Sequence, residues 1–401
     1  MPPTAHALLA PSSAKRWMAC PPSARLEAQI PEKDTVYTRE GTIAHEVAEF
    51  ILRRYRDRHL LPANDIWLEQ QAWGEEEWIN LGADALLQGF YFKEIVETVH
   101  DNYVKVVMED YLTAQAQFSD TELFIETPLK LGAFIPEGFG SSDAVIIYNQ
   151  TLQVYDLKYG KGVKVMAKEN AQMRCYALGA YCGAGEMYDI KTVIMTIVQP
   201  RLQHVSSEAL PADELYAWGL QTLKPAAERA WKGEGAPVPG DHCHFCKAAP
   251  QCRALRDLAV DTAAAGTDPA LMSVEEIADC LVKIQTIKDW VAALEEHALS
   301  AAMDGTSIPG WKVVEGRSIR KISDPETAVA VLTKAGFQPS DYFRPSELKT
   351  ISDLEKLVGK KSFATLLGPY VVKPQGKPTL APNDDPRPAY SQAEADFKDQ
   401  L

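Results

Sequence analysis

The chain has 401 residues, of which 46% are hydrophobic and 24% are charged. This ordinary globular composition excludes a disordered or fibrous protein, and the length predicts two or three structural units. The net charge of −14 excludes a general polycationic binder, so a nucleic-acid site must be a local basic cleft. No apolar run is long enough to span a membrane and no signal peptide is recognisable, which predicts a cytoplasmic protein with reduced cysteines.

The spacing of apolar residues predicts an α/β fold whose first part combines helices with short strands. The expected elements are helices over 41–59, 67–116, 167–183 and 211–232, and strands over 123–131, 144–148, 152–157 and 191–199. A Pro- and Gly-rich link over 233–240 leads to a group of cysteines. The first domain is therefore expected to span residues 1–260.

A change of character near residue 261 predicts a second, mostly helical region over 261–370. Ser273 and Glu276 form a capping box. After them, apolar residues from Ile277 to Ala301 recur at alternating intervals of three and four residues. This heptad seam predicts one long helix that either packs on its own chain or pairs with a second copy. We further expect a hairpin over 309–323, two or three short helices over 325–368 and a Pro-rich extended tail over 371–401.

The sharpest chemical signal is a predicted hairpin that carries two aspartates and a lysine. If Asn149 and Gln150 form a two-residue turn, the register of the two strands places Asp143 opposite Asp156. Facing carboxylates repel each other, and a bound Mg²⁺ or Mn²⁺ removes that repulsion. Strand alternation puts Lys158 on the same face as Asp156, where an ammonium offsets charge on a phosphate. The alternative is a surface hairpin with a solvated Asp–Lys pair.

Four short motifs follow one another along the chain, and each is weak alone. They are Gly41…His45, Gly140…Asp143, Asp156-Leu157-Lys158 and Gln172…Tyr176. In this order they resemble the RecB-like branch of the PD-(D/E)xK nucleases, over residues 12–255. The resemblance implies a nuclease core in which a mixed sheet is flanked by helices.

The same resemblance implies roles for individual residues. The metal would be bound by His45, Asp143, Asp156 and the carbonyl of Leu157. Lys158 would position the attacking water, and Gln172 and Tyr176 would contact DNA near the scissile phosphate. Glu126, on the strand before the hairpin, either supports this site or pairs with a lysine at the strand edge.

Three of the seven cysteines are spaced in a way that predicts a metal centre, and they need a fourth ligand. Cys243, Cys246 and Cys252 follow the expected core, and Cys20 lies far upstream of it. The residues alone leave open an iron–sulfur cluster, a Zn²⁺ site of four thiolates or of three thiolates and an imidazole from His242 or His244, or no metal. One cysteine before the core and three after it resemble the AddB-type RecB-like exonucleases and the CRISPR-associated spacer-acquisition nucleases. That resemblance implies a [4Fe–4S] cluster that staples the two ends of the core.

Basic residues gather near the expected site although the chain is acidic overall. They are Lys158, Lys161, Lys164 and Lys168 after the hairpin, Arg53, Arg54, Arg56 and Arg58 on the His45 helix, and Lys15, Arg16 and Arg25 near Cys20. This clustering suits a phosphate-binding cleft, whereas the alternative is a set of solvated faces and helix-end charges.

Together these patterns predict a Mg²⁺- or Mn²⁺-dependent DNA nuclease, an exonuclease rather than a sequence-specific endonuclease. The segment 376–388 resembles a phage and prophage family of RecB-like nucleases. That resemblance implies phage recombination or DNA processing in a bacterial host cytosol, beside a single-strand-binding or annealing protein. Two other hypotheses are a non-catalytic DNA-binding scaffold and a hydrolase of RNA or nucleotides on the same core.

Overall fold

The computed structural model describes residues 7–31, 35–58, 76–264, 271–316, 320–344, 347–372, 378–382, 385 and 387–390. The chain divides into two compact units, Met1–Trp290 and Val291–Leu401, and the residues of the long helix α12 (Val274–Met303) belong partly to each. Among the described residues, no helix is long and apolar enough to cross a membrane. The predicted α/β class is confirmed, because a five-stranded mixed sheet is flanked by helices.

The first unit combines helices and strands largely as predicted. Its helices before α12 are α1 (Ala14–Ala19), α2 (Ser23–Glu27), α3 (Val36–Arg58), α5 (Glu76–Leu87), α6 (Phe92–Val99), α7 (Lys105–Gln117), α8 (Ala171–Tyr188), α9 (Ala212–Trp218), α10 (Lys224–Lys232) and α11 (Arg253–Ala264). Its strands are β1 (Glu122–Lys130), β2 (Phe139–Tyr148), β3 (Thr151–Leu157), β4 (Thr192–Gln199) and β5 (His204–Pro211). The strand β5 has no counterpart in the prediction.

The predicted helices have different bounds in the structure, and for α3 and the helix expected over 67–116 the local cause is clear. α3 begins at Val36 because the Thr35 hydroxyl accepts a hydrogen bond from the Thr38 backbone N–H (3.1 Å) and caps the helix. Of the helix predicted over 67–116, residues 67–75 lie outside the described residues, and the rest forms α5, α6 and α7. Gly89 follows α5 with a φ of 80°, a left-handed conformation that glycine adopts without a Cβ clash.

The predicted hairpin and its register are confirmed. Tyr148 pairs with Thr151, and Asn149 and Gln150 have φ values of 38° and 61°, the left-handed pair that a type I′ turn requires. The order of strands in the sheet is β1-β2-β3-β4-β5. β3 and β4 are parallel, with α8 between them in the chain, and the other neighbours are antiparallel.

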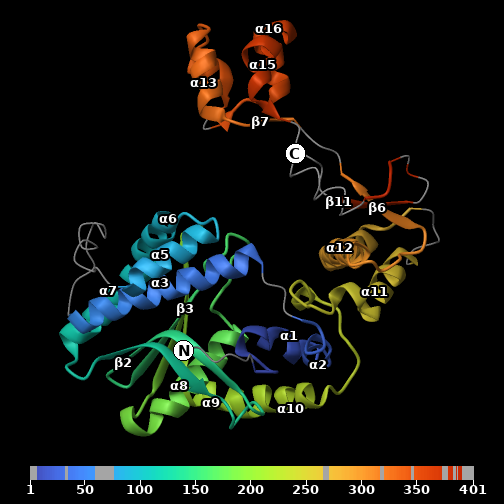
Figure 1. Ribbon diagram of the computed structural model, residues 1–401. Helices are drawn as coiled ribbons and strands as arrows, with labels where there is room; N and C mark the ends of the chain where they lie inside the picture. The colour runs from blue at the N-terminus through green and yellow to red at the C-terminus, as the bar shows by residue number, and fades with distance from the viewer. Residues whose placement is uncertain are drawn as a thin grey trace. The chain divides into compact units, whose positions relative to one another are not determined.

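Two hydrophobic cores lie on the two faces of this sheet. Val145 and Val154 belong to the core that includes residues of α1, α8, α9 and α10, whereas Ala144 and Tyr155 belong to the core that includes α3, α6 and α7. Figure 1 shows α3, α5 and α6 on one side of the sheet and α8 and α9 on the other. Strand alternation therefore sends adjacent side chains of β2 and β3 into opposite cores.

The second unit contains short helices and, among the described residues, three two-stranded sheets. Its elements after α12 are β6 (Trp311–Glu315), β7 (Lys321–Ile322), α13 (Pro325–Lys334), α14 (Pro339–Tyr342), β8 (Phe343–Arg344), β9 (Glu347–Leu348), α15 (Ile351–Val358), α16 (Lys360–Leu366), β10 (Val371–Val372) and β11 (Pro378–Pro382). β6 pairs with β11 and β7 with β10, so the hairpin predicted over 309–323 is wrong. Its two strands have partners in the predicted tail, which a local pattern does not reveal.

The long helix α12 begins with the predicted capping box. The Ser273 backbone N–H donates to Glu276 Oε2 (2.7 Å), and the Glu276 N–H donates to Ser273 Oγ (3.2 Å). Gly305, with a φ of 90°, follows the end of the helix. Within the described residues none of the helix side chains is buried, and its pairing with a second copy stays a prediction.

Candidate metal site and cysteine cluster

Three acidic residues occupy one row across neighbouring strands. Ala144 pairs with β1 on one side and with β3 on the other. Asp143 is the residue before Ala144 on β2. If the same register is continued by one residue, Asp143 lies between Glu126 of β1 and Asp156 of β3. The sequence predicts the second of these neighbours but not the first. A row of three carboxylates opposes folding unless protons or a cation offset the charge.

The Glu126 backbone departs from regular strand geometry. Its φ is 47°, and a non-glycine residue in this left-handed region costs about 1 kcal/mol or more. Leu123 and Ile125 face one core. Leu129 would face the same core if side chains alternated strictly along β1, but it faces the other, so the alternation is interrupted in this stretch. Such strain is retained mainly where the surrounding structure or a function demands it.

His45 completes a group that is able to hold a metal ion. α3 directs a buried apolar stripe into the core, formed by Ala44, Val47, Ala48 and Ile51. His45, at the edge of this stripe, has its Nδ1 3.2 Å from Asp143 Oδ1. One ligand atom from each of His45, Glu126 and Asp143 lies within 4.8 Å of the others. Imidazole and carboxylate oxygens are common ligands of divalent cations.

The Asp143 carboxylate is held from two sides. Its Oδ1 faces His45, and its Oδ2 accepts a hydrogen bond from the Leu157 backbone N–H (2.6 Å). Leu157 thus contacts the site through its backbone, while its side chain is buried in the core. The described contacts of Leu157 involve its N–H, and the metal-binding role implied for its carbonyl stays a prediction.

Lys158, Gln172 and Tyr176 form a chain of contacts around Asp156. Lys158 Nζ donates to Asp156 Oδ1 (3.2 Å) and to Gln172 Oε1 (3.0 Å). Gln172 Nε2 donates to the same Asp156 oxygen (3.2 Å) and to the Tyr176 hydroxyl (3.0 Å). The other oxygen, Asp156 Oδ2, is buried and has no hydrogen-bond partner, although Lys158 Nζ lies 3.0 Å away. The sequence motifs therefore meet at one site, where the Lys158 ammonium is the ion-pair partner of Asp156 Oδ2.

The charges of the site shift its pKa values in opposite directions. Burial lowers the pKa of His45, but the neighbouring Asp143 and Asp156 outweigh it and raise that pKa to about 9. Burial and repulsion by Asp143 raise the pKa of Glu126 to about 7. Burial also raises the pKa of Asp156, whereas His45 holds the pKa of Asp143 below its usual value despite burial. Without metal, the imidazolium of His45 is the counterion of Asp143.

We expect the metal-free protein to lose stability as pH rises from about 5 to 9. The His45 pKa is raised from 6.5 to about 9, so its contribution is complete below 6.5 and disappears through pH 9. The Glu126 pKa is raised from 4.5 to about 7, so ionisation of this carboxyl destabilises the fold over that interval. Urea denaturation in EDTA at several pH values measures the effect.

The matched control for this prediction is the double variant His45→Asn/Glu126→Gln, which removes both titrations. Its unfolding free energy should fall less steeply between pH 5 and 9 than that of the wild-type protein. An unchanged slope in the variant would show that other groups determine the pH dependence, and that His45 and Asp143 do not form the inferred ion pair.

The site opens onto a groove of about 2220 Å³ lined by α3, α5, β1, β2, β3 and α8. The α3 and α5 side of this groove is acidic, with Glu46, Glu49, Glu76, Glu77 and Asp84. Burial and these acidic neighbours raise the pKa of Glu46. An anionic substrate is therefore repelled from the α5 side and has to approach the site from elsewhere.

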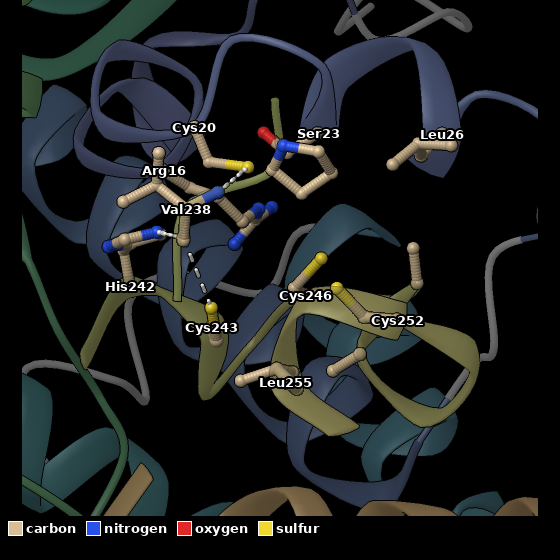
Figure 2. Close-up of a pocket in the computed structure, with 13 residues that line it drawn as sticks. Arg16, Cys20, Ser23, Leu26, Val238, His242, Cys243, Cys246, Cys252 and Leu255 are labelled. Carbon is tan, nitrogen blue, oxygen red and sulfur yellow. Dashed lines mark hydrogen bonds between the residues drawn. The ribbon is translucent and has the colours of Figure 1, made fainter. Parts of the chain in front are cut away.

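The four cysteines singled out by the sequence line one cavity (Figure 2). Cys20 comes from the N-terminal segment and is 7% exposed, whereas Cys243, Cys246 and Cys252 follow α10 and are partly buried. The Cys20 sulfur accepts a hydrogen bond from the Val238 N–H (3.5 Å). Burial raises the pKa of Cys246 to about 12, so this thiol ionises at neutral pH only with a compensating cation.

Protein contacts hold the two cysteine-bearing segments together. Arg16 Nε donates to Glu27 Oε2 (2.7 Å), and the other Glu27 oxygen accepts from the Lys247 backbone N–H (2.8 Å). Arg25 Nε donates to the Trp231 carbonyl (2.8 Å). The contacts of Glu27 with Lys247 and of Arg25 with Trp231 join residues more than 200 positions apart. The frame around the cysteines is therefore built by the polypeptide itself.

The spacing of the sulfur atoms bears on which metal fits. Among the described residues, which include all four cysteines, no three of these sulfurs lie within 4.8 Å of one another. A single tetrahedral Zn²⁺, with Zn–S distances of about 2.3 Å, brings its sulfurs to about 3.8 Å apart. His244 bonds Asp289 instead (2.7 Å), and His242 bonds the Val238 carbonyl (2.8 Å). The arrangement is wider than one zinc ion requires.

The fold and the site define a mixed α/β protein with a histidine–carboxylate group in a groove and a separate four-cysteine cavity. The chain belongs to the family described as "Protein of unknown function (DUF2800)", whose model matches residues 6–388. A solved structure titled "Crystal structure of SSO0001" is similar at 12% identity with a TM-score of 0.24. The match covers 61% of this chain and 95% of that one. At this TM-score the likeness does not establish a shared fold.

Proposed function

We propose that the protein is a Mg²⁺- or Mn²⁺-dependent DNA nuclease, built on a RecB-like PD-(D/E)xK core, that acts in recombination or DNA processing. The observation that carries this proposal is the row of Glu126, Asp143 and Asp156 beside His45 and Lys158, in which Asp156 is buried and the other two carboxylates are partly buried. A sheet gains nothing in stability from three adjacent carboxylates. A binding site for a hard cation explains why they lie together.

The residues fit such a cation. His45, Glu126 and Asp143 offer ligand atoms within 4.8 Å of one another, and Asp156 Oδ2 is buried without a hydrogen-bond partner. A Mg²⁺ or Mn²⁺ ion bound there would act as a Lewis acid toward a phosphate oxygen and toward water. Glu126 thus joins the ligands that the resemblance implies, and its strained backbone is consistent with that role.

The remaining polar side chains would act on the phosphodiester directly. The Lys158 ammonium, 3.0 Å from Asp156, would offset the negative charge that develops on phosphorus oxygens. Gln172 fixes the Lys158 amine by accepting its hydrogen bond, and the Tyr176 hydroxyl anchors Gln172. Preorganisation of this kind favours the transition state because no side chain has to move when charge develops.

We propose that the cysteine cavity holds a [4Fe–4S] cluster, as in the AddB-type arrangement. The supporting observations are four free cysteines around one cavity and sulfur separations wider than a single zinc ion needs. A cubane cluster spreads four thiolates over four iron atoms. When bound, it would add a covalent connection to the contacts that Glu27 and Arg25 make between the segments.

The test of the proposed function is a comparison of substrate classes with iron-replete protein. Labelled DNA, RNA and nucleoside triphosphates are each incubated with Mg²⁺, Mn²⁺ or EDTA, and unlabelled competitors are added in turn. We expect metal-dependent hydrolysis of DNA that excess DNA suppresses and nucleotides do not. Hydrolysis of RNA or nucleotides alone would change the substrate class, and binding of DNA without hydrolysis would favour a scaffold.

A further inference from the structure

Some basic residues near the site are paired with acidic side chains or backbone carbonyls of the protein, and others have no ion pair in the described residues. Arg53 is paired with Glu49 (2.5 Å), Lys15 with Asp241 (2.5 Å), and Arg25 donates to a backbone carbonyl. In contrast, no ion pair within the described part of the chain neutralises the three exposed lysines between β3 and α8, which are Lys161, Lys164 and Lys168. We call residues 159–170 the lysine loop.

Both ends of the lysine loop meet at the candidate metal site. The loop leaves β3 directly after Lys158 and enters α8 just before Gln172, and these two side chains are hydrogen-bonded (3.0 Å). Asn170 caps α8 by accepting a hydrogen bond from the Met173 N–H (3.1 Å). The two ends of the loop are therefore anchored next to Asp156 and Lys158.

The backbone of the loop is fastened to the sheet by buried polar side chains. Gln199, 2% exposed, accepts from the Val165 N–H (2.7 Å) and donates to the Val163 carbonyl (3.0 Å). Ser206 Oγ accepts from the Ala167 N–H (3.0 Å). With these backbone groups satisfied on the sheet side, the Val163 and Met166 side chains lie outward, 71% and 55% exposed.

From this arrangement we infer that the lysine loop binds an unpaired DNA strand beside the scissile bond, with phosphates at Lys161 and Lys164 and base faces against Val163 and Met166. The inference rests on the proposed nuclease function. The faces of unpaired bases are open to apolar side chains, whereas in a duplex a base step has to be unstacked first at a cost of a few kcal/mol. The loop therefore favours single-stranded or opened ends. The acidic α3 and α5 side of the groove repels phosphates, and none of its residues belongs to the lysine loop.

The experiment measures binding of a labelled single-stranded oligonucleotide to the full-length protein in Ca²⁺ by fluorescence anisotropy. Lys161→Ala/Lys164→Ala should weaken binding about 25-fold at 0.1 M salt, since each lost contact lowers the salt slope by about 0.7. The matched control, Lys224→Ala/Arg229→Ala, changes the same charge on α10, outside the lysine loop, and should bind like the wild-type protein.

A second pair of variants tests the apolar contacts. Val163→Ser/Met166→Gln should weaken single-strand binding several-fold without changing the salt slope, and should reduce the preference for single-stranded over duplex DNA. The matched control, Val260→Ser/Met187→Gln, replaces two other exposed apolar side chains, 51% and 78% exposed, and should leave binding unchanged.

The outcomes separate this inference from the proposed function. If the wild-type protein cleaves DNA and both loop variants bind as it does, the loop inference is overturned while the nuclease stands. If the loop variants bind no worse than their matched controls, the loop inference is overturned in the same way. If the wild-type protein neither binds nor cleaves DNA with metal present, the proposed function fails, and the loop inference fails with it.

Discussion

Replacing Asp156 by asparagine should abolish DNA cleavage while leaving the metal-free protein at least as stable as the wild type. The asparagine side chain would keep an oxygen that accepts from Lys158 and Gln172, so the local hydrogen bonds survive. The variant lacks the buried charge, and the raised pKa of Asp156 shows that its surroundings disfavour that charge. Loss of a carboxylate ligand should lower the cleavage rate at least about a thousandfold.

The measurement combines single-turnover cleavage in Mn²⁺ with urea denaturation in EDTA. The matched control is Asp110→Asn, which alters a carboxylate that bonds Gln153 and Tyr155 of the same strand but does not line the groove. This control should retain cleavage. Cleavage by folded Asp156→Asn at the wild-type rate would remove Asp156 from the catalytic site, and a large loss of metal-free stability would contradict the electrostatic account of the row.

Replacing Cys20 by serine should remove the iron and lower the free energy of unfolding by about 3 kcal/mol or more. In the proposed cluster Cys20 is the only ligand from the N-terminal segment, so its loss leaves three thiolates, too few to retain the iron, and removes the connection between the two segments. The hydrogen bonds of Glu27 and Arg25 persist, and the fold should therefore weaken rather than collapse. Iron analysis, visible absorption and urea denaturation of protein purified without oxygen measure the three effects.

The matched control for this variant is Cys182→Ser, an exposed cysteine of α8 outside the cavity. It should keep iron, colour and stability. Wild-type protein that contains one zinc and no iron would refute the cluster. Retention of a full iron content by Cys20→Ser would show that the N-terminal segment is not a ligand, whatever the metal.

The hairpin register was predictable because its turn has two residues, which leaves the strands no freedom to slip. The position of Glu126 in the row of carboxylates was not predictable, because a longer connection joins its strand to β2. Eight residues, 131–138, separate β1 from β2, and a connection of that length does not fix which residues face each other. A lone glutamate near a sheet edge also carries no motif, so the sequence left its role open.

The other differences have separate causes. β5 alternates between exposed and buried residues at the edge of the sheet and contains two serines, which weakens its apolar pattern. β6 pairs with β11, a strand much further along the chain, and no local sequence pattern predicts such a partner. The grouping of Cys20 with cysteines more than 200 residues away came from the resemblance, because chain spacing alone does not bring distant residues together.

The most direct test of the account is a time course with end-labelled linear DNA, single- and double-stranded, and iron-replete protein in Mg²⁺, Mn²⁺ or EDTA. Wild-type protein and the Lys158→Ala variant are compared at equal concentration. The account predicts metal-dependent release of labelled product by the wild type, none in EDTA, and at least about a thousandfold less with Lys158→Ala. Equal degradation by both proteins, or none by a folded and metal-loaded wild type, would contradict it.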